Sequence, residues 1–378
     1  MEQFIFDKQK VFFYLIAVFL LLIISCRGSS KSDDIYSSNI PVDIYVGGSL
    51  YTNSSHCQVA VLWKNGEIVP LSTKPSWVTS IAVSGNDVYA GGYIFSSSIV
   101  GQDDIELRVA GYWKNGNWVK LSALSKYDSV IHSVFVSEND VYAGGYSKNK
   151  LEVRVAGYWK NQKWVSLVPV NSKYNSEVRT IFVFNDDVYA GGYKDNAGVI
   201  MPGYWKNGEW AALLSFSERK HAGVHSMFVS ENNVYASGYS RNNLGAAIAC
   251  YWKNGEIIPL LPPDSKYRSR GASIFVSGKD VYVGGCTEND SGNEIACYWK
   301  NGKLIKLTPM DNSISSEVTS IFVFGKDVYA AGYCRDSSWE SVVGYWKNGK
   351  WIGFNVKRKN WDMPVSSIVV VPKPAGQE

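Results

Sequence analysis

The residues that most often bind metals or transfer protons are scarce in this chain of 378 residues. Its four histidines are His56, His132, His221 and His225. A spacing of four would bring His221 and His225 together on a helix, but they lie where a loop is expected to enter a strand. No glycine-rich phosphate loop precedes a helical pattern, and no strand–turn–helix nucleophile motif occurs. The sequence therefore predicts no catalytic residue, no metal site and no cofactor.

The chain has six cysteines, of which Cys26 stands near the N-terminus. Cys286 and Cys297 flank one predicted hairpin loop, so the sequence offers them as a possible disulfide if the domain folds in an oxidising compartment. The odd number of cysteines after Cys26 leaves at least one free thiol unless pairing is intermolecular. The five are Cys57, Cys250, Cys286, Cys297 and Cys334.

The first 26 residues are typical of a processing signal rather than of a folded element. A short charged region precedes an uncharged apolar run, Val11–Ile24. Fourteen helical residues would span roughly 21 Å, which is short of a hydrocarbon core of about 30 Å. A secretory signal at 1–25 is therefore expected. The sequence Ile23-Ile24-Ser25-Cys26 resembles the lipobox of bacterial lipoproteins, which implies cleavage before Cys26 and attachment of lipid, including palmitate, to that residue.

The resemblance to lipoproteins implies a location in the cell envelope. Residues 26–42 contain the lipidated cysteine and a Ser- and Asp-rich tether. Arg27 stands where an aspartate would direct retention in the inner membrane, so the sequence favours the outer membrane or the cell surface. The expected partners are a membrane, through the lipid, and an unknown protein or glycan. We expect a monomer.

One pattern of about 47 residues recurs seven times. Its tryptophan falls at 63, 113, 159, 205, 252, 299 and 346, with spacings of 50, 46, 46, 47, 47 and 47. Each copy reads as four short strands, which is typical of propeller blades. The Asn-Gly turn that follows Trp-Lys in six copies favours a type I′ hairpin, whereas Asn161-Gln162 in the third copy predicts a looser turn.

The copies do not begin and end in register. The first copy has Ile44-Tyr45-Val46 but no strand before it, and an extra strand, Val365–Val371, follows the last copy. We therefore expect an all-β, seven-bladed β-propeller of four-stranded blades over 43–371, in which the C-terminal strand completes the first blade. Residues 372–378 form a tail.

The order of glycines and aromatic residues in each copy resembles the kelch repeat. In the third copy the matching residues are Gly144-Gly145, Tyr158, Trp164 and Leu167. The resemblance covers about 43–371, although Ser237-Gly238 in the fifth copy departs from it. It implies a propeller. The repeated Tyr-Trp pairs are expected to pack between blades.

In such blades two kinds of connection emerge on opposite faces. We call the face with the short, uniform turns the short-turn face, where aspartates such as Asp87 and Asp140 are expected to cap turns. The opposite, long-loop face carries varied connections, including Ile94–Arg108, Ser147–Arg154, Lys194–Pro202 and Ser240–Ala247. Tyrosines that end second strands beside these loops are candidate ligand contacts around the channel mouth: Tyr93, Tyr146, Tyr193, Tyr239 and Tyr333.

Three functions remain open from the sequence. The leading hypothesis is a lipid-anchored interaction module, not an enzyme, that binds a protein or glycan through the long-loop face. The first alternative is a glycan-active enzyme with carboxylates such as Asp103, Asp104 or Glu106 at the channel mouth. The second is a purely structural envelope protein. The net charge of +4, from 38 basic and 34 acidic residues, gives no support to nucleic-acid binding.

Overall fold

The computed structural model describes residues 40–52, 57–100, 103–217, 221–261, 265–359 and 365–373. The predicted signal at 1–25, the lipidation site at Cys26, most of the tether and most of the tail lie outside these residues. All the regular elements in the described ranges are β-strands. No helix in these ranges is long and apolar enough to cross a membrane.

The strands follow one another along the chain in short antiparallel runs. They are β1 (Val42–Thr52), β2 (Cys57–Lys64), β3 (Glu67–Ser84), β4 (Asp87–Val100), β5 (Asp103–Lys114), β6 (Asn117–Lys120), β7 (Ser129–Ser137), β8 (Asp140–Lys148), β9 (Arg154–Lys160), β10 (Lys163–Ser166), β11 (Ser176–Phe184), β12 (Asp187–Asn196), β13 (Val199–Lys206), β14 (Glu209–Ala212), β15 (Ala222–Ser230), β16 (Asn233–Arg241), β17 (Ala247–Lys253), β18 (Glu256–Pro259), β19 (Ser269–Ser277), β20 (Asp280–Glu288), β21 (Glu294–Lys300), β22 (Lys303–Lys306), β23 (Ser313–Phe324), β24 (Asp327–Asp336), β25 (Glu340–Lys347), β26 (Lys350–Lys359) and β27 (Val365–Pro372).

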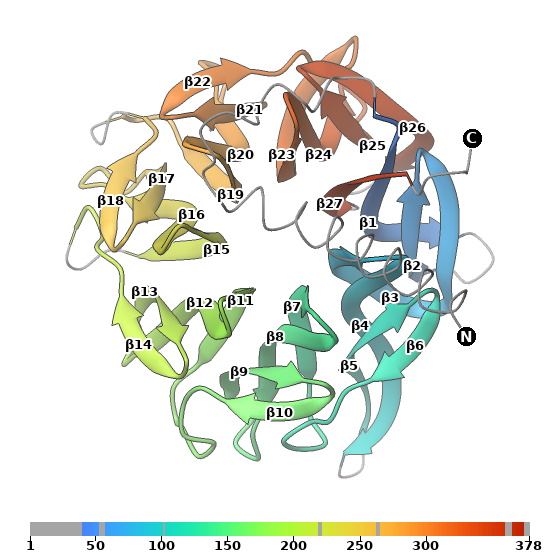
Figure 1. Cartoon of the computed structure of the whole chain (residues 1–378), viewed down its shortest axis with the longest axis vertical. Coiled ribbons are helices and arrows are strands. Elements are labelled where there is room, and N and C mark those ends of the chain that lie inside the picture. Colours follow the sequence, from blue (N-terminus) through green and yellow to red (C-terminus); the bar gives the residue numbers. More distant parts are fainter. Residues whose placement is uncertain are drawn as a thin grey trace, which may run out of the picture.

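The sheets are arranged around a central axis, as Figure 1 shows. Five of them have four antiparallel strands each, and one has seven strands in the order β27-β1-β2-β3-β4-β5-β6. The long strand β3 explains the larger sheet, because residues 67–70 pair with β2 and residues 76–84 pair with β4. At the other end of that sheet, β27 pairs with β1 although the two are more than 300 residues apart. The protein therefore has an all-β, β-propeller-like fold.

One strand of each four-stranded group lies nearest the axis (Figure 1), and we call these the inner strands. They are β7, β11, β15, β19, β23, β27 and residues 76–84 of β3. Each inner strand has a register shift that leaves one extra residue opposite its partner. A bulge of this kind leaves its extra residue out of the ladder and bends the strand.

The residue after each bulge carries a hydroxyl that links one inner strand to the next. That oxygen accepts a hydrogen bond of 3.1–3.3 Å from a backbone N–H two residues after the bulge of the next inner strand. The last of these bonds runs from Ile81 in β3 to Ser367 in β27. The seven hydroxyls belong to Ser80, Ser133, Thr180, Ser226, Ser273, Ser320 and Ser367.

The Gly-Gly pairs follow from the bulge. A Cβ on Gly145 would lie 1.9 Å from the carbonyl oxygen of Val130, just before the bulge of its own sheet. A Cβ on Gly144 would instead meet Val178 of the next inner strand at 2.8 Å. The first position accepts Ala331 and Ser237 in other copies, whereas the second is glycine in all seven. The second glycine is therefore required because a Cβ would collide with a backbone oxygen. The first glycine can be replaced where the neighbouring side chains make room.

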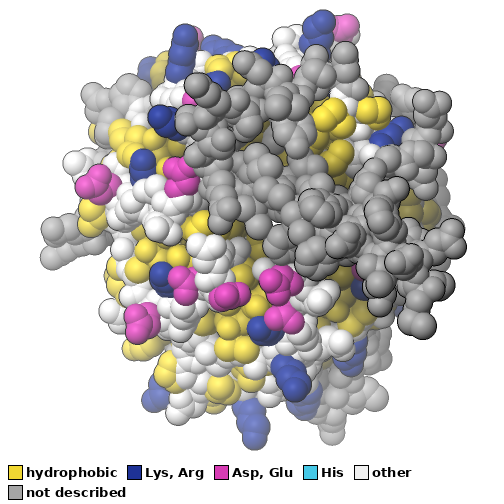
Figure 2. Space-filling model, in the orientation of Figure 1, with side chains coloured by type: hydrophobic (Ala, Val, Ile, Leu, Met, Phe, Trp, Pro, Cys, Tyr) yellow, Lys and Arg dark blue, Asp and Glu magenta, His cyan; other side chains and the backbone are white. Residues whose placement is uncertain are grey.

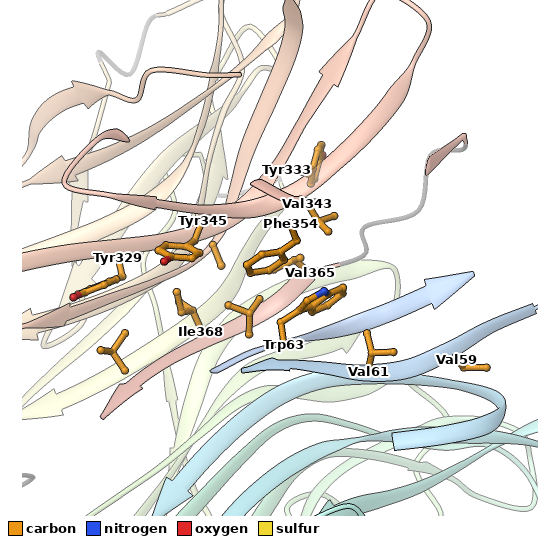
Figure 3. Close-up of a cluster of buried hydrophobic side chains, with 13 residues drawn as sticks. Val59, Val61, Trp63, Tyr329, Tyr333, Val343, Tyr345, Phe354, Val365 and Ile368 are labelled. Carbon is orange, nitrogen blue, oxygen red and sulfur yellow. The ribbon is translucent and has the colours of Figure 1, made fainter. Parts of the chain in front are cut away.

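Aromatic residues fill the space between neighbouring sheets. All seven tryptophans of the Trp-Lys-Asn motif are at most 2% exposed. Trp113 packs with residues of β1 and β2, whereas its neighbour Tyr112 packs with β7, so adjacent side chains serve opposite faces of one sheet. Figure 3 shows the cluster at β27, where Trp63 stacks on Phe354 with ring centroids 5.3 Å apart. Val365 and Ile368 of β27 are buried in the same cluster.

The Trp-Lys-Asn turns are type I′ in all seven copies, because both central residues have positive φ. The turn at Asn161-Gln162 keeps this geometry, with Gln162 at φ 72°, and its Asn161 amide donates to the Val141 carbonyl of β8 at 2.9 Å, as the equivalent asparagines do in the other copies. The prediction of a looser turn there is therefore wrong.

The aspartates on the short-turn face do more than cap their own turns. The Asn115 amide donates to Asp87 at 2.7 Å, and Lys114 forms an ion pair with the same carboxylate at 2.7 Å. The pKa of Asp87 is held below its usual value by these two side chains. The same Asp–Asn–Lys arrangement recurs at Asp43, Asp140, Asp187, Asp280 and Asp327.

The glycine pair gives a direct stability test. Gly145→Ala should destabilise the protein by about 3 kcal/mol or more, because its Cβ meets a backbone oxygen that moves only with the strand. Gly144→Ala should cost less, about 1–2 kcal/mol, because its Cβ meets side-chain atoms of Val178 and Ile181 rather than a backbone oxygen. Urea unfolding of both variants measures the difference. Equal costs would show that the bulge does not impose the second glycine.

Candidate functional site

The bulges place a ring of side chains at the inner edge of the sheets. We call the seven bulge residues the axial residues, and six of them are polar. All seven are half-buried or exposed, although the strands around them are buried. They are Thr79, His132, Arg179, His225, Ala272, Thr319 and Ser366. The inner strands enter from the long-loop face, so these residues lie near that end of the axis.

Glu177, two residues before Arg179, is the centre of a charged cluster. Its carboxylate accepts a hydrogen bond from the Tyr193 hydroxyl at 2.9 Å. Arg154 of the preceding sheet lies at 3.2 Å and Arg179 at 3.3 Å, and His132 contacts the other side of the carboxylate through Nε2. The Glu177 side chain is 2% exposed, so four partners surround one buried charge.

These partners keep Glu177 ionised. Burial alone would raise the pKa of Glu177, but His132, Arg179 and Tyr193 together hold the pKa of that carboxyl well below its usual range. Burial lowers the pKa of His132, although the adjoining Glu177 carboxylate opposes this shift. Burial and the neighbouring carboxylate raise the pKa of Tyr193 to about 12.

His225 occupies the next axial position beyond Arg179. Its Nδ1 lies 3.0 Å from the carbonyl oxygen of Gly271, which makes Nδ1 the donor and leaves Nε2 as an acceptor. Burial, with weaker repulsion from Arg270 and Arg179, lowers the pKa of His225 to about 4. The imidazole is therefore neutral at physiological pH.

A second carboxylate, Glu317, occupies the position in β23 that corresponds to Glu177 in β11. It accepts a hydrogen bond from Tyr333 at 2.7 Å and pairs with Arg270 of the preceding inner strand. Desolvation would lower the pKa of Arg270, but Glu317 raises it above its usual value. Burial and the charge of Glu317 raise the pKa of Glu294, which stands on the facing strand.

The sequence predicted no metal site, but the fold brings three ligand-type side chains together beside Glu317. The ligand atoms of Cys286, Glu294 and Glu317 all lie within 4.8 Å of one another.

The five predicted tyrosines stand at one level, each opposite a residue just before a bulge. Tyr93, Tyr146 and Tyr333 are buried, whereas Tyr193 and Tyr239 are half-buried. Tyr193 and Tyr333 bind the two carboxylates through their hydroxyls. The structure therefore places two of the five tyrosines against the buried carboxylates, and none of the five is exposed.

The proposed Cys286–Cys297 disulfide is not formed, and both residues are free thiols. The register pairs Cys286 with Ala296 and Cys297 with Gly285, so the two side chains point to opposite faces of the sheet. The candidate carboxylates Asp103 and Asp104 pair with Val100 and Ile99 at the far end of the β4–β5 hairpin. Exposed Glu106 belongs to the same hairpin end, away from the charged cluster.

The sequence analysis did not predict the charged residues around the axis. When the seven copies are treated as equivalent, every residue that recurs in them is interpreted as a packing residue. The signal is instead the residue that changes between copies, two positions before each bulge residue. That position holds Trp77, Val130, Glu177, Gly223, Arg270 and Glu317.

Comparison with known proteins does not assign the chain to a family. A solved structure titled "Structure of YjhT" is similar over 74% of this chain and 97% of that chain, with 12% sequence identity and a TM-score of 0.42. No protein-family model and no curated protein matches the chain. The fold description therefore rests on the pairing of the strands given above.

The Glu177 cluster makes stability depend on pH. The folded pKa of Glu177 is depressed, so its contribution is complete above its unfolded value of 4.5 and is lost as the pH falls through the folded value. Glu177→Gln should lower the free energy of unfolding by about 2–3 kcal/mol at pH 7, because Arg154 and Arg179 lose the charge of the buried carboxylate that they contact. The difference from wild type should shrink below pH 4.5.

Denaturant unfolding at several pH values measures this effect. Glu152→Gln is the control, because that side chain is 60% exposed and its removal should change stability by less than about 0.5 kcal/mol. A Glu177→Gln cost that stays constant down to pH 3 would contradict an ionised, ion-paired Glu177.

Proposed function

We propose that the chain forms a closed ring of seven four-stranded blades, related to kelch propellers, in which β27 completes the first blade. Two observations support the ring. The seven hydroxyl bonds pass from each inner strand to the next and return from β27 to β3. The Trp63–Phe354 stack and the burial of Val365 join the last sheet to the first (Figure 3). The kelch relation rests on the order of Gly-Gly, Tyr, Trp and Leu in each copy.

We further propose that Cys26 carries a lipid and holds the ring at the cell envelope with its long-loop face directed outward. Asp43 binds Lys64 and Asn65 of a short turn, so the chain enters the ring at the short-turn face. The Lys373 amide bonds to Pro41, so both ends of the described ring lie on that face. A tether there would leave the opposite face free.

The function best supported is recognition of a glycan at the long-loop end of the axis. The observation that carries it has two parts. Polar axial residues are accessible to a ligand, and the carboxylates near them are buried with their charge balanced by ion pairs. Arg179, with 41% of its side chain exposed, offers donors, and the neutral His225 offers an acceptor. Sugar hydroxyls use both kinds of partner. A general acid or base needs a pKa near the working pH, and neither Glu177 nor His225 has one.

A protein ligand is the second candidate. Exposed apolar side chains stand at the tips of connections on the long-loop face, including Leu151, Leu244 and Trp339. Such side chains favour contact with a protein surface. Figure 2 shows charged side chains of both signs interspersed with hydrophobic ones over the coloured part of one face.

Binding to immobilised neutral and acidic oligosaccharides tests the proposed recognition. The full chain should bind at least one class, and Arg179→Ala should weaken that binding by about tenfold or more, since it removes a charge-assisted donor. Lys253→Ala is the matched control, because this exposed lysine lies beside a turn on the short-turn face. Failure of every oligosaccharide to bind, or equal loss in both variants, would contradict recognition at the axis.

The anchor is tested separately. Cys26→Ala should move the processed protein from the detergent phase to the aqueous phase in phase partitioning, because the proposed lipid supplies the membrane affinity. Retention of the processed variant in detergent would overturn lipidation at Cys26.

A further inference from the structure

The sheet of β19–β22 departs from the other sheets at two diagonally neighbouring positions. The second-strand position is Ser49 in the first copy and tyrosine in five copies, Tyr93, Tyr146, Tyr193, Tyr239 and Tyr333, but it is Cys286 in this sheet. The diagonal third-strand position holds Gln58, Arg108, Arg154, Ile200, Ala247 and Ser341 elsewhere, but here it is Glu294. A thiol and a carboxylate thus replace two side chains on the same face of one sheet.

The pleat brings these two residues together. Cys286 pairs with Ala296, and Glu294 lies two residues from Ala296, so both side chains project from the same face. That face packs against β23, which contributes Glu317. The three ligand atoms come from β20, β21 and β23, and all lie within 4.8 Å of one another.

The Cys286 thiol is buried within this group. Its residue is 3% exposed, and its sulfur lies within 4.8 Å of a carboxylate oxygen of each glutamate. A packing cysteine would be expected among apolar groups, whereas this one faces two carboxylates. We propose that Cys286, Glu294 and Glu317 bind a divalent transition-metal ion of the Zn²⁺ type.

The chemical types of the three ligands, one thiolate and two carboxylates, determine which class of ion can bind. A thiolate favours Zn²⁺ and related ions over Mg²⁺ and Ca²⁺, and carboxylates are acceptable to Zn²⁺. Binding deprotonates the Cys286 thiol, and the released proton passes to solvent. A tetrahedral ion holds its ligand atoms about 3.5 Å apart, and the three atoms here lie within 4.8 Å of one another.

The surroundings orient the Glu317 carboxylate. Arg270 and Tyr333 bind Glu317 and fix its carboxylate, as outer partners of metal ligands do. Buried Arg335 lies nearby over the Tyr333 ring, at 4.5 Å from its centroid. Glu294 is half-buried, whereas Cys286 and Glu317 are buried. The protein supplies three ligands, and zinc sites with three protein ligands take a water or another ligand at the fourth position.

Titration of the metal-free full chain with Co²⁺ tests this site directly. We expect one Co²⁺ per chain with a thiolate-to-metal charge-transfer band, and displacement of that band by Zn²⁺. Cys286→Tyr, which restores the residue of five other copies, should abolish the band. Glu294→Gln, a conservative change that keeps the shape of the side chain, should weaken Co²⁺ binding by about tenfold or more.

Cys297→Ala is the matched control. It removes a buried thiol from the opposite face of the same hairpin and should leave the band and the affinity unchanged. Absence of the band in the wild-type chain at saturating Co²⁺, or its persistence in Cys286→Tyr, would overturn the proposal. Equal loss in Cys297→Ala would also overturn it.

Discussion

A serine or threonine hydroxyl accepts a backbone hydrogen bond from the next inner strand at seven equivalent places, and the rest of the fold depends on the bulge that makes this contact. The bulge turns the inner strand so that its next residue reaches across to the neighbouring sheet. The same bulge pushes a carbonyl oxygen to within 1.9 Å of where a Cβ would stand on Gly145, and this proximity requires glycine there. One backbone feature thus accounts for the Gly-Gly pair and for the linkage between sheets.

The bulge also determines where functional side chains can stand. Its extra residue leaves the hydrogen-bonded ladder and faces the axis, so its identity can vary without loss of pairing. Arg179 and His225 occupy two of these positions, whereas the charged groups of the short-turn face are fixed by Asp–Asn–Lys contacts such as Asp87 with Asn115. The charged groups that stabilise turns therefore lie at the short-turn end of the axis. The charged groups that differ between copies lie at the long-loop end.

Periodicity made the strands and their order predictable, because each copy repeats the same alternation and the same Asn-Gly turn. The partner of β1 followed from the unpaired strand at Val365–Val371, and β27 does pair with β1. The site was less predictable, since the Glu177 cluster joins residues from β7, β9, β11 and β12 that only tertiary packing brings together. The prediction of a Cys286–Cys297 disulfide was wrong because residues that flank a hairpin loop can still project from opposite faces of the sheet.

Closure through β27 is the central claim, and thermal unfolding of a truncated chain tests it most directly. Deletion of residues 365–378 removes the hydroxyl of Ser367 and the buried side chains of Val365 and Ile368. The account predicts a fall in Tm on the order of 10 °C or more, relative to a control that lacks only residues 374–378. An unchanged Tm in the longer deletion would contradict closure of the ring by this strand.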